Sequence, residues 1–439
     1  MPENILVVGA TGYIASKLIP LLINEGHSVR CLARAPEKLR RRKWHDQVEI
    51  VKADVNQAES LTAALEGITT AYYLVHNMSA GSNYAKLDVS AAENFGVAAK
   101  AAGVRRIVYL GGLANTKEEG LALHLASRIQ TGDMLRRGGV PVIEFRVGVV
   151  VGAGSVSFEM IRFIAEQFPL MVGPLWLRHR SQPASVINVL QYLIEVIRID
   201  LAENAIVDIG SQQVHSYIGI MERYAQLRGL RRWPLLLPLI PAHLMAFFIS
   251  KLTPVEFAYA LPLVEGLQND SLIQFTQHQH LFAHIPLLEY DQAVKAALQE
   301  TNLEEVERPW LETAKDDQVW FHSGLVVHFQ RRVITGDGQS LLRTVQAKAV
   351  EIVTDIGISN VEAMFDGSSG VSVSGMLHGK GKVWLCWHLH HGNRGWTIEQ
   401  TSALRPDGLP AFLWLYTQQG ALRNRLSATL TDLISKTPW

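Results

Sequence analysis

Short apolar runs alternate with segments of helical periodicity along the first 150 residues of the chain. The apolar runs predict buried strands, and apolar residues three or four positions apart predict amphipathic helices between them. Strands separated by helices indicate repeated βαβ units, and therefore an α/β fold with a doubly wound parallel sheet. The predicted strands are Ile5–Val8, Ser28–Ala33, Val48–Lys52, Ala71–Val75, Arg106–Leu110 and Pro141–Arg146, and the predicted helices are Ile14–Asn24, Leu61–Leu65, Val89–Ala101 and Ala122–Leu135.

The pattern loosens after this core, residues 1–150, and changes character near the end of the chain. We expect residues 151–300 to complete the same domain, with a further strand at Ala205–Ile209. This part should form the side of the domain that binds substrate and an apolar lid over it. Residues 301–315 are polar and acidic and predict a linker. Residues 316–439 predict a smaller α+β domain, because strand patterns precede one long helical pattern. The predicted strands there are Val319–Val333, Thr344–Val353, Ser359–Phe365, Val371–Leu377, Lys382–His388 and Gly395–Thr401, and the helix is Pro410–Ile434.

Composition and charge exclude several classes of protein. The 439 residues include 41 Lys plus Arg and 41 Asp plus Glu, so no net charge attracts nucleic acid. The two cysteines, Cys31 and Cys386, lie in apolar runs and predict buried thiols rather than a disulfide. Histidines cluster at 388, 390 and 391, but no acidic or cysteine partner recurs at ligand spacing. We therefore expect no metal site.

An apolar segment at residues 231–250 leaves three interpretations open. It is about as long as a membrane-spanning helix, but Pro234, Pro238 and Pro241 interrupt its first half. The segment could form a lid over a substrate site, a contact between two copies of the chain in a homodimer, or a segment that lies on a membrane surface. Arginines directly before the apolar run favour the membrane surface. The first apolar run of the chain is too short for a signal peptide, so we expect a cytoplasmic protein, membrane-associated under the third interpretation.

The junction between the first strand and the first helix is rich in glycine. Gly9 ends the strand where a side chain would obstruct the turn, and Gly12 allows the backbone to approach a ligand closely. The small Ala15 allows the helix to pack on the sheet. A helix that begins here presents unpaired N–H groups and a positive dipole end, which together bind phosphate. The candidate pyrophosphate-contacting residues are Gly9, Ala10, Thr11, Gly12, Tyr13 and Ile14.

The ends of the second and third strands indicate which dinucleotide is bound. No carboxylate ends the second strand, and Arg34 stands where it could pair with a 2′-phosphate. NADP(H) is therefore favoured over NAD(H). The alternative is that Arg34 belongs to a solvated basic run that continues at residues 40–43. Asp54 ends the third strand and is placed to accept a hydrogen bond from the adenine amino group, with the backbone of Val55 completing the contact.

These motifs resemble the atypical, NmrA-like branch of the short-chain dehydrogenase/reductase superfamily, with Ala15 replacing the usual third glycine. The resemblance implies an NAD(P)-binding Rossmann fold. The last part of the chain is similar, more loosely, to the START-like helix-grip domain that a bacterial subgroup carries. The matching stretches are Gly9–Ala15, Arg34, Asp54–Val55, Arg106–Leu113, His124–Arg128, Phe145–Gly152, Pro262–Gly266 and, for the second domain, Trp396–Pro406.

The expected catalytic residues of that superfamily are replaced in this chain. Its enzymes use a Ser and a Tyr-x-x-x-Lys pair, whereas this sequence has Gly111-Gly112 and His124-x-x-x-Arg128. Either His124 donates the proton and Arg128 anchors the ribose, or both residues are structural and the domain binds NADP(H) without turnover. A histidine titrates closer to neutrality than a tyrosine, so under the first interpretation His124 acts as an acid without a large shift of its pKa. His76, after the fourth strand, and Gly111 are further candidate cofactor contacts, and we expect Asp88 to be a helix cap or an interface residue.

Three functional hypotheses follow. The first is an NADP(H)-dependent oxidoreductase that transfers hydride to a small-molecule substrate, namely a bulky apolar carbonyl, enone or quinone-like compound. The second is a non-catalytic NADP(H)-binding redox sensor or assembly protein. The third is a peripheral membrane protein that binds lipid or quinone and holds the nucleotide structurally.

Overall fold

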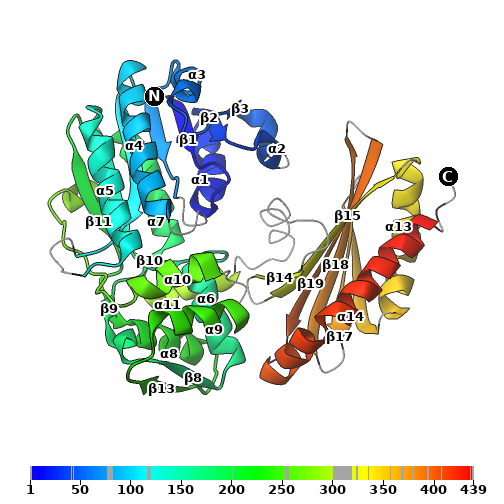
Figure 1. Ribbon diagram of the computed structural model, residues 1–439. Coiled ribbons are helices and arrows are strands. Elements are labelled where there is room, and N and C mark those ends of the chain that lie inside the picture. Colours follow the sequence, from blue (N-terminus) through cyan, green and yellow to red (C-terminus); the bar gives the residue numbers. More distant parts are fainter. Residues whose placement is uncertain are drawn as a thin grey trace. The chain divides into compact units, whose positions relative to one another are not determined.

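The computed structural model describes most of the chain, in two compact units (Figure 1). One unit comprises Met1–Ile161 and Met171–Glu300, and the other comprises Arg162–Leu170 and Thr301–Trp439. The predicted linker, residues 301–315, lies outside the described residues. Those residues are 2–40, 42, 44–76, 83–115, 120–199, 201–252, 257–299, 319–322, 325–334, 336–355, 357–366, 370–377, 380–392, 395–406, 408–435 and 437.

A seven-stranded parallel sheet forms the centre of the first unit, in the order β11-β6-β5-β4-β1-β2-β3. The predicted doubly wound fold is therefore confirmed, and the strand expected at Ala205–Ile209 joins the same sheet. The order reverses between β1 and β4, which is where open α/β sheets bind ligands. The strands are β1 (Asn4–Val8), β2 (Ser28–Ala33), β3 (Glu49–Lys52), β4 (Thr70–Tyr73), β5 (Arg106–Gly112), β6 (Val142–Val147) and β11 (Ala205–Ile209).

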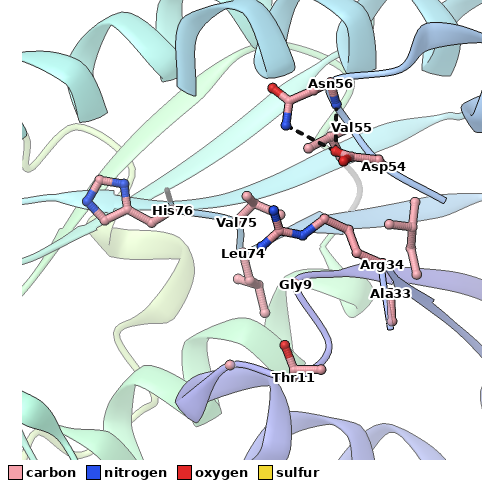
Figure 2. A pocket seen from close by; sticks show the side chains of 12 residues that line it. Gly9, Thr11, Ala33, Arg34, Asp54, Val55, Asn56, Leu74, Val75 and His76 are labelled. Atoms are coloured by element: carbon pink, nitrogen blue, oxygen red, sulfur yellow. Dashed lines mark hydrogen bonds between the residues drawn. The ribbon is translucent and has the colours of Figure 1, made fainter. Parts of the chain in front are cut away.

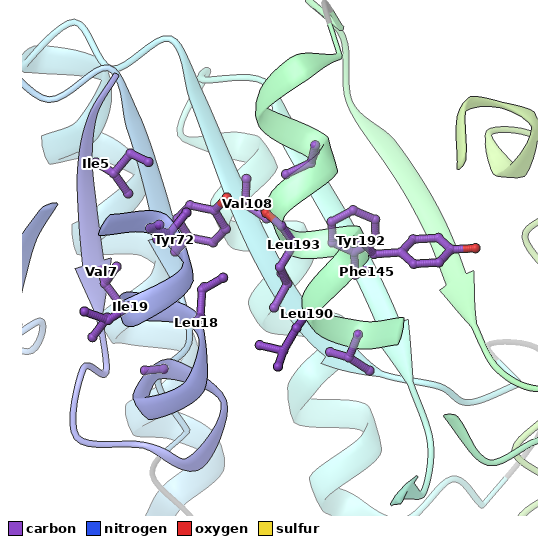
Figure 3. Close-up of a cluster of buried hydrophobic side chains, with 14 of the residues drawn as sticks. Ile5, Val7, Leu18, Ile19, Tyr72, Val108, Phe145, Leu190, Tyr192 and Leu193 are labelled. Carbon is purple, nitrogen blue, oxygen red and sulfur yellow. Dashed lines mark hydrogen bonds between the residues drawn. The ribbon is translucent and has the colours of Figure 1, made fainter. Parts of the chain in front are cut away.

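Helices cover both faces of this sheet because the side chains of each strand alternate between the faces. Ile5 and Val7 of β1 pack with Leu18 of α1 and with α7 on one face (Figure 3). Leu6 and Val8 pack with α3, α4 and α5 on the other face. The helices of this part are α1 (Tyr13–Asn24), α2 (Pro36–Leu39), α3 (Leu61–Leu65), α4 (Tyr84–Ala101), α5 (Leu123–Arg137), α6 (Val156–Gln167) and α7 (Val186–Glu195).

The rest of the first unit consists of helices and short strand pairs. The proline-bearing apolar segment divides into β13 (Trp233–Leu237), which pairs with β8 (Leu170–Pro174), and the eleven-residue α9 (Ala242–Leu252). Within the part of the chain that the structure describes, no helix has the length and apolarity needed to cross a bilayer. The remaining elements are β7 (Val150–Val151), β9 (Arg180–Ser181), β10 (Ala184–Ser185), β12 (His215–Ser216), α8 (Tyr217–Leu227), α10 (Phe257–Gly266) and α11 (Tyr290–Gln299).

The second unit contains a six-stranded antiparallel sheet in the order β14-β15-β19-β18-β17-β16. Two helices, α13 (Gly338–Asp355) and α14 (Gly408–Ser435), share one apolar core with the sheet around the buried Trp387. A smaller α+β domain at the end of the chain is thus confirmed, whereas its START-like character stays a prediction. The strands are β14 (Val319–His322), β15 (Leu325–Ile334), β16 (Ile358–Asp366), β17 (Gly370–Leu377), β18 (Gly381–Gly392) and β19 (Gly395–Pro406).

Two predicted strands of the second unit are wrong. The single strand expected at Val319–Val333 is two antiparallel strands, β14 and β15. Residues 344–353 lie inside α13, not in the sheet. Leu341, Val345 and Ala349 recur every four residues and are all buried in the core. This spacing is that of one helix face, and the β-branched residues of the segment concealed it.

Candidate functional site

The turn after β1 requires glycine at its first position. Gly9 has a φ of +84°, and a Cβ placed on it would lie 2.8 Å from the carbonyl oxygen of Leu74. The N–H of Gly12 donates to the Gly9 carbonyl at 2.9 Å, which closes the turn. A side chain at residue 9 would therefore be strained by its φ and would also collide with the segment that follows β4.

The N-terminus of α1 has no side-chain cap. Gly12 is the N-cap residue, and the first backbone bond of the helix runs from the N–H of Ser16 to the Gly12 carbonyl at 2.9 Å. The N–H groups of Ile14 and Ala15 precede that bond and point out of the helix end. Ala15 itself is buried, as the close packing of helix on sheet requires. This end can bind an anion.

A pocket opens beside this turn, at the carboxyl ends of the parallel strands (Figure 2). Gly9, Thr11 and Gly12 line it, whereas Ala10 is buried in the apolar core and Tyr13 and Ile14 begin α1 without lining it. Figure 2 shows His76 on the opposite side of the pocket from Asp54. The lining residues are Gly9, Thr11, Gly12, Leu32, Ala33, Arg34, Asp54, Val55, Asn56, Leu74, Val75 and His76.

Arg34 follows directly after β2 and is exposed at the pocket. Among the described residues, none forms a hydrogen bond or an ion pair with its guanidinium. Glu49, on the neighbouring strand β3, is engaged elsewhere, since it pairs with Arg30 at 2.6 Å. Arg34 is therefore available to pair with an anionic ligand.

Asp54 and Asn56 form a small hydrogen-bonded loop at the end of β3. One carboxylate oxygen of Asp54 accepts from both the backbone N–H and the side-chain amide of Asn56, each at 3.0 Å. Val55 is buried, and its carbonyl accepts from Asn94 at 3.3 Å. The loop fixes the Asp54 carboxylate at the pocket. Sequence reasoning missed Asn56, although Asp-x-Asn is typical of such a turn.

His76 is held by an acidic residue on α4. Its Nδ1 lies 2.8 Å from the Asp88 carboxylate, which also accepts from the Ser127 hydroxyl at 3.3 Å. Burial and the nearby Arg128 lower the pKa of His76, and Asp88 opposes them. The ring is thus neutral at pH 7. Because a carboxylate can only accept, Nδ1 carries the hydrogen and Nε2 keeps a lone pair.

The expectation about Asp88 needs correction, and one residue of the arrangement was missed. Asp88 is neither a cap nor an interface residue, since it is buried inside α4 and bonded to His76. Ser127, which completes the arrangement, lies on α5 and was not identified from the sequence. No local pattern indicates that residues 76, 88 and 127 meet, because they come from three different elements.

His124 does not titrate near neutrality, contrary to the expectation from its residue type. Burial, with help from Arg128 and His76, lowers its pKa to about 3. Its ring packs directly against Gly266 of α10, where even a Cβ would collide with it. His124 is therefore a neutral, enclosed side chain at pH 7 and does not line the pocket beside the turn.

Arg128 packs against Gly112, one of the two glycines of β5. A Cβ on Gly112 would lie 2.8 Å from Cδ of Arg128, so a serine there would displace the arginine. Among the described residues, none pairs with the Arg128 guanidinium, which is half-buried. Gly111 faces the ring of Tyr109 and the carboxylate of Glu144, and the structure does not place it at the pocket.

No group of three or more His, Cys, Asp or Glu residues suited to a metal lies within the described ranges. Both cysteines are buried free thiols there, as expected. The sulfur of Cys386 lies 3.2 Å from Nε2 of His388.

Comparisons with known proteins agree with this geometry. Residues 9–136 match a family of domains described as NAD(P)H-binding. The chain is 32% identical over 116 residues to a 3 beta-hydroxysteroid dehydrogenase/Delta 5-->4-isomerase of Mycobacterium tuberculosis, covering 24% of this chain and 30% of that protein. It is 38% identical over 66 residues to the photosystem II assembly factor Ycf39 of Cyanophora paradoxa, covering 15% and 20%. The chain thus spans less than a third of either relative.

A solved structure shares the fold of the first unit. Citrobacter sp. triphenylmethane reductase complexed with NADP(H) superimposes with a TM-score of 0.53 at 19% identity, over 67% of this chain and 99% of that one. The parallel sheet and this superposition show that the first unit has a Rossmann-like α/β fold, and the family match over residues 9–136 is to NAD(P)H-binding domains.

Proposed function

We propose that this protein is an NADP(H)-dependent oxidoreductase that moves hydride between the nicotinamide and a bulky apolar carbonyl, enone or quinone-like substrate. One observation carries the proposal. A single pocket joins the Gly9–Gly12 turn to Arg34 and to His76, which is held by Asp88. It therefore offers a diphosphate site, a cation for a 2′-phosphate and a group that can exchange a proton.

The residues of the pocket fit such a cofactor. Gly9 leaves space that a Cβ would fill, and the uncapped end of α1 supplies N–H groups for the diphosphate. Arg34 suits the 2′-phosphate, because a guanidinium binds phosphate through two parallel hydrogen bonds. The Asp54 carboxylate, fixed by Asn56, suits the adenine amino group.

The proton at the reacting end is assigned to His76. A bound nicotinamide supplies or accepts the hydride. Asp88 keeps the hydrogen of the neutral ring on Nδ1, so in alcohol oxidation Nε2 can take the proton of the substrate hydroxyl. In carbonyl reduction the ring first takes a proton from water on Nε2 and then donates it to the substrate oxygen. Asp88 stabilises the charged ring in both directions. Arg128, beside Gly112, is suited to hold an oxygen of substrate or ribose.

The test combines cofactor binding with turnover. We expect calorimetry to show tight NADPH binding, and NADPH absorbance to decay with at least one member of a panel of enones, quinones and bulky ketones. His76→Gln should then reduce turnover about a hundredfold or more while leaving NADPH affinity unchanged. His124→Gln is the matched control and should reduce turnover much less.

A second function, a non-catalytic NADP(H) sensor or assembly protein, is favoured by the same part of the site. Gly111 and Gly112 replace the serine, His124 and Arg128 stand in place of the Tyr-x-x-x-Lys pair on the helix after β5, and His124 is neutral and enclosed. The similarity to an assembly factor points the same way. Tight NADPH binding with no turnover of any panel member would favour this function over the oxidoreductase.

A further inference from the structure

We propose that the first unit carries a docking surface for an anionic membrane, formed by β13 and α9. This surface, called here the apolar face, consists of Trp233, Leu237, Leu239, Leu244, Phe247 and Phe248. Each of these side chains is exposed. The proposal is independent of the oxidoreductase function, because the apolar face shares no residue with the cofactor pocket.

The exposure on α9 follows one helical stripe. Leu244, Phe247 and Phe248 are spaced i, i+3 and i+4 and are each nearly half exposed, whereas Ala246 and Ile249 are buried on the opposite side. A helix on a surface that faces water normally presents polar residues on its outer side. Here both sides are apolar, so the outer stripe is suited to a second apolar environment.

The turn between β13 and α9 exposes a leucine to solvent in a strained backbone conformation. Leu239 is 97% exposed and has a φ of +61°. A left-handed conformation costs a residue with a Cβ about 1–2 kcal/mol, and this side chain recovers nothing by packing. Strain of this kind persists where function requires it. The position places a large apolar group at the tip of the turn.

Charge identifies the occupant as an anionic bilayer rather than a neutral one. The segment from Arg228 to Leu252 contains four basic residues and no acidic residue, although the chain as a whole is neutral. Arg231 is exposed beside Trp233, and the Lys251 ammonium lies 5.7 Å from the centre of the Phe247 ring. Tryptophan, phenylalanine and flanking cations are the composition of segments that lie in the headgroup region.

The length of α9 excludes a spanning arrangement for this element. Eleven residues of helix rise about 16 Å, roughly half of the hydrocarbon thickness of a bilayer. The segment therefore lies along the surface, with its apolar side chains among the lipid headgroups and acyl chains.

Vesicle flotation of the full chain tests the proposal. We expect the protein to float with phosphatidylcholine–phosphatidylglycerol vesicles, to float much less with phosphatidylcholine alone, and to be released by high salt. The triple variant Leu239→Ser, Phe247→Ser, Phe248→Ser should lose at least about tenfold in bound fraction. Arg231→Gln with Arg232→Gln should weaken binding only to the anionic vesicles.

A matched control distinguishes binding through the apolar face from non-specific binding through any exposed apolar side chain. Val97 on α4 is 62% exposed and lies outside the apolar face, so Val97→Ser should float like the wild type. Retained NADPH binding and far-ultraviolet circular dichroism show that each variant is folded. The proposal is overturned if the wild type ignores anionic vesicles, or if Val97→Ser loses as much binding as the triple variant. It is also overturned if light scattering shows a dimer that the triple variant converts to a monomer without any vesicle binding.

Discussion

The proposed function assigns the preference for NADP(H) over NAD(H) to a single side chain, Arg34. It is exposed at the pocket, and no described residue pairs with it. A charge-assisted pair with a 2′-phosphate contributes about 1.5–3 kcal/mol. Arg34→Ala should therefore weaken NADPH binding roughly tenfold to a hundredfold and leave NADH binding nearly unchanged, as measured by calorimetry.

The control for this prediction is Arg40→Ala. Arg40 is also exposed but does not line the pocket. It belongs to the basic run that is the alternative explanation for Arg34. Equal losses of NADPH affinity in the two variants would show that the positive field of the run, rather than a specific pair, attracts the phosphate.

His124 makes stability depend on pH. Its pKa is about 3 in the folded protein, against 6.5 ordinarily, because burial disfavours the charged ring. The unfolded chain therefore binds this proton more readily between pH 6.5 and 3, so stability falls as the pH falls through that window. At pH 5 this effect lowers the free energy of unfolding by about 2 kcal/mol relative to neutral pH.

Urea denaturation of the wild type and of His124→Gln measures this effect. The free energy of unfolding of the wild type should drop on going from pH 7.5 to pH 5, and that of the variant should drop by about 2 kcal/mol less. Both proteins retain His76, whose pKa is also lowered, so the difference isolates His124. Identical pH dependence in both would mean that the ring of His124 is accessible to protons in the folded state.

At the scale of an element, the β1–α1 junction combines two demands on Gly9. Its φ is positive, and a Cβ would approach the Leu74 carbonyl to 2.8 Å. Gly9→Ala should reduce the free energy of unfolding by about 1–3 kcal/mol and should also abolish most NADPH binding, because the turn must shift. Chemical denaturation and calorimetry provide the two measurements.

Gly26 is a suitable control for this substitution. Its φ of +83° nearly equals that of Gly9, but nothing lies within 4 Å of a Cβ placed there. Gly26→Ala therefore reports the backbone strain alone. If it costs as much stability as Gly9→Ala and both variants keep NADPH affinity, the close approach to β4 has no part in binding.

The sequence predicted the elements of the first unit well, but it missed the division of residues 319–333 into β14 and β15 and the helix α13 in the second unit. Over residues 1–150 the apolar side chains recur with a clear strand or helix period on both sides of each turn. The same side chains form the core, so local pattern and tertiary packing favour the same elements. In α13 the β-branched residues favour a strand locally. Burial of Leu341, Val345 and Ala349 on one face overrides that preference.

At the scale of the whole molecule, the pocket lies within one of two compact units. A ligand that binds only the folded form stabilises the unit that holds it, by about 2.7 kcal/mol at a hundred times its Kd. Hydrogen exchange with NADPH should therefore slow in β1, α1 and β4 and stay unchanged in α13 and α14. Equal protection of both units would show that they unfold together.

The sequence by itself determined the sheet, the glycine turn and the cation after β2, because each depends on residues that are neighbours in the chain. It did not reveal that Asp88 and Ser127 orient His76, or that His124 is held neutral against Gly266. Only the tertiary structure decided those points. Hydrogen bonds and desolvation act between elements that the fold brings together, and they leave no periodic trace along the chain.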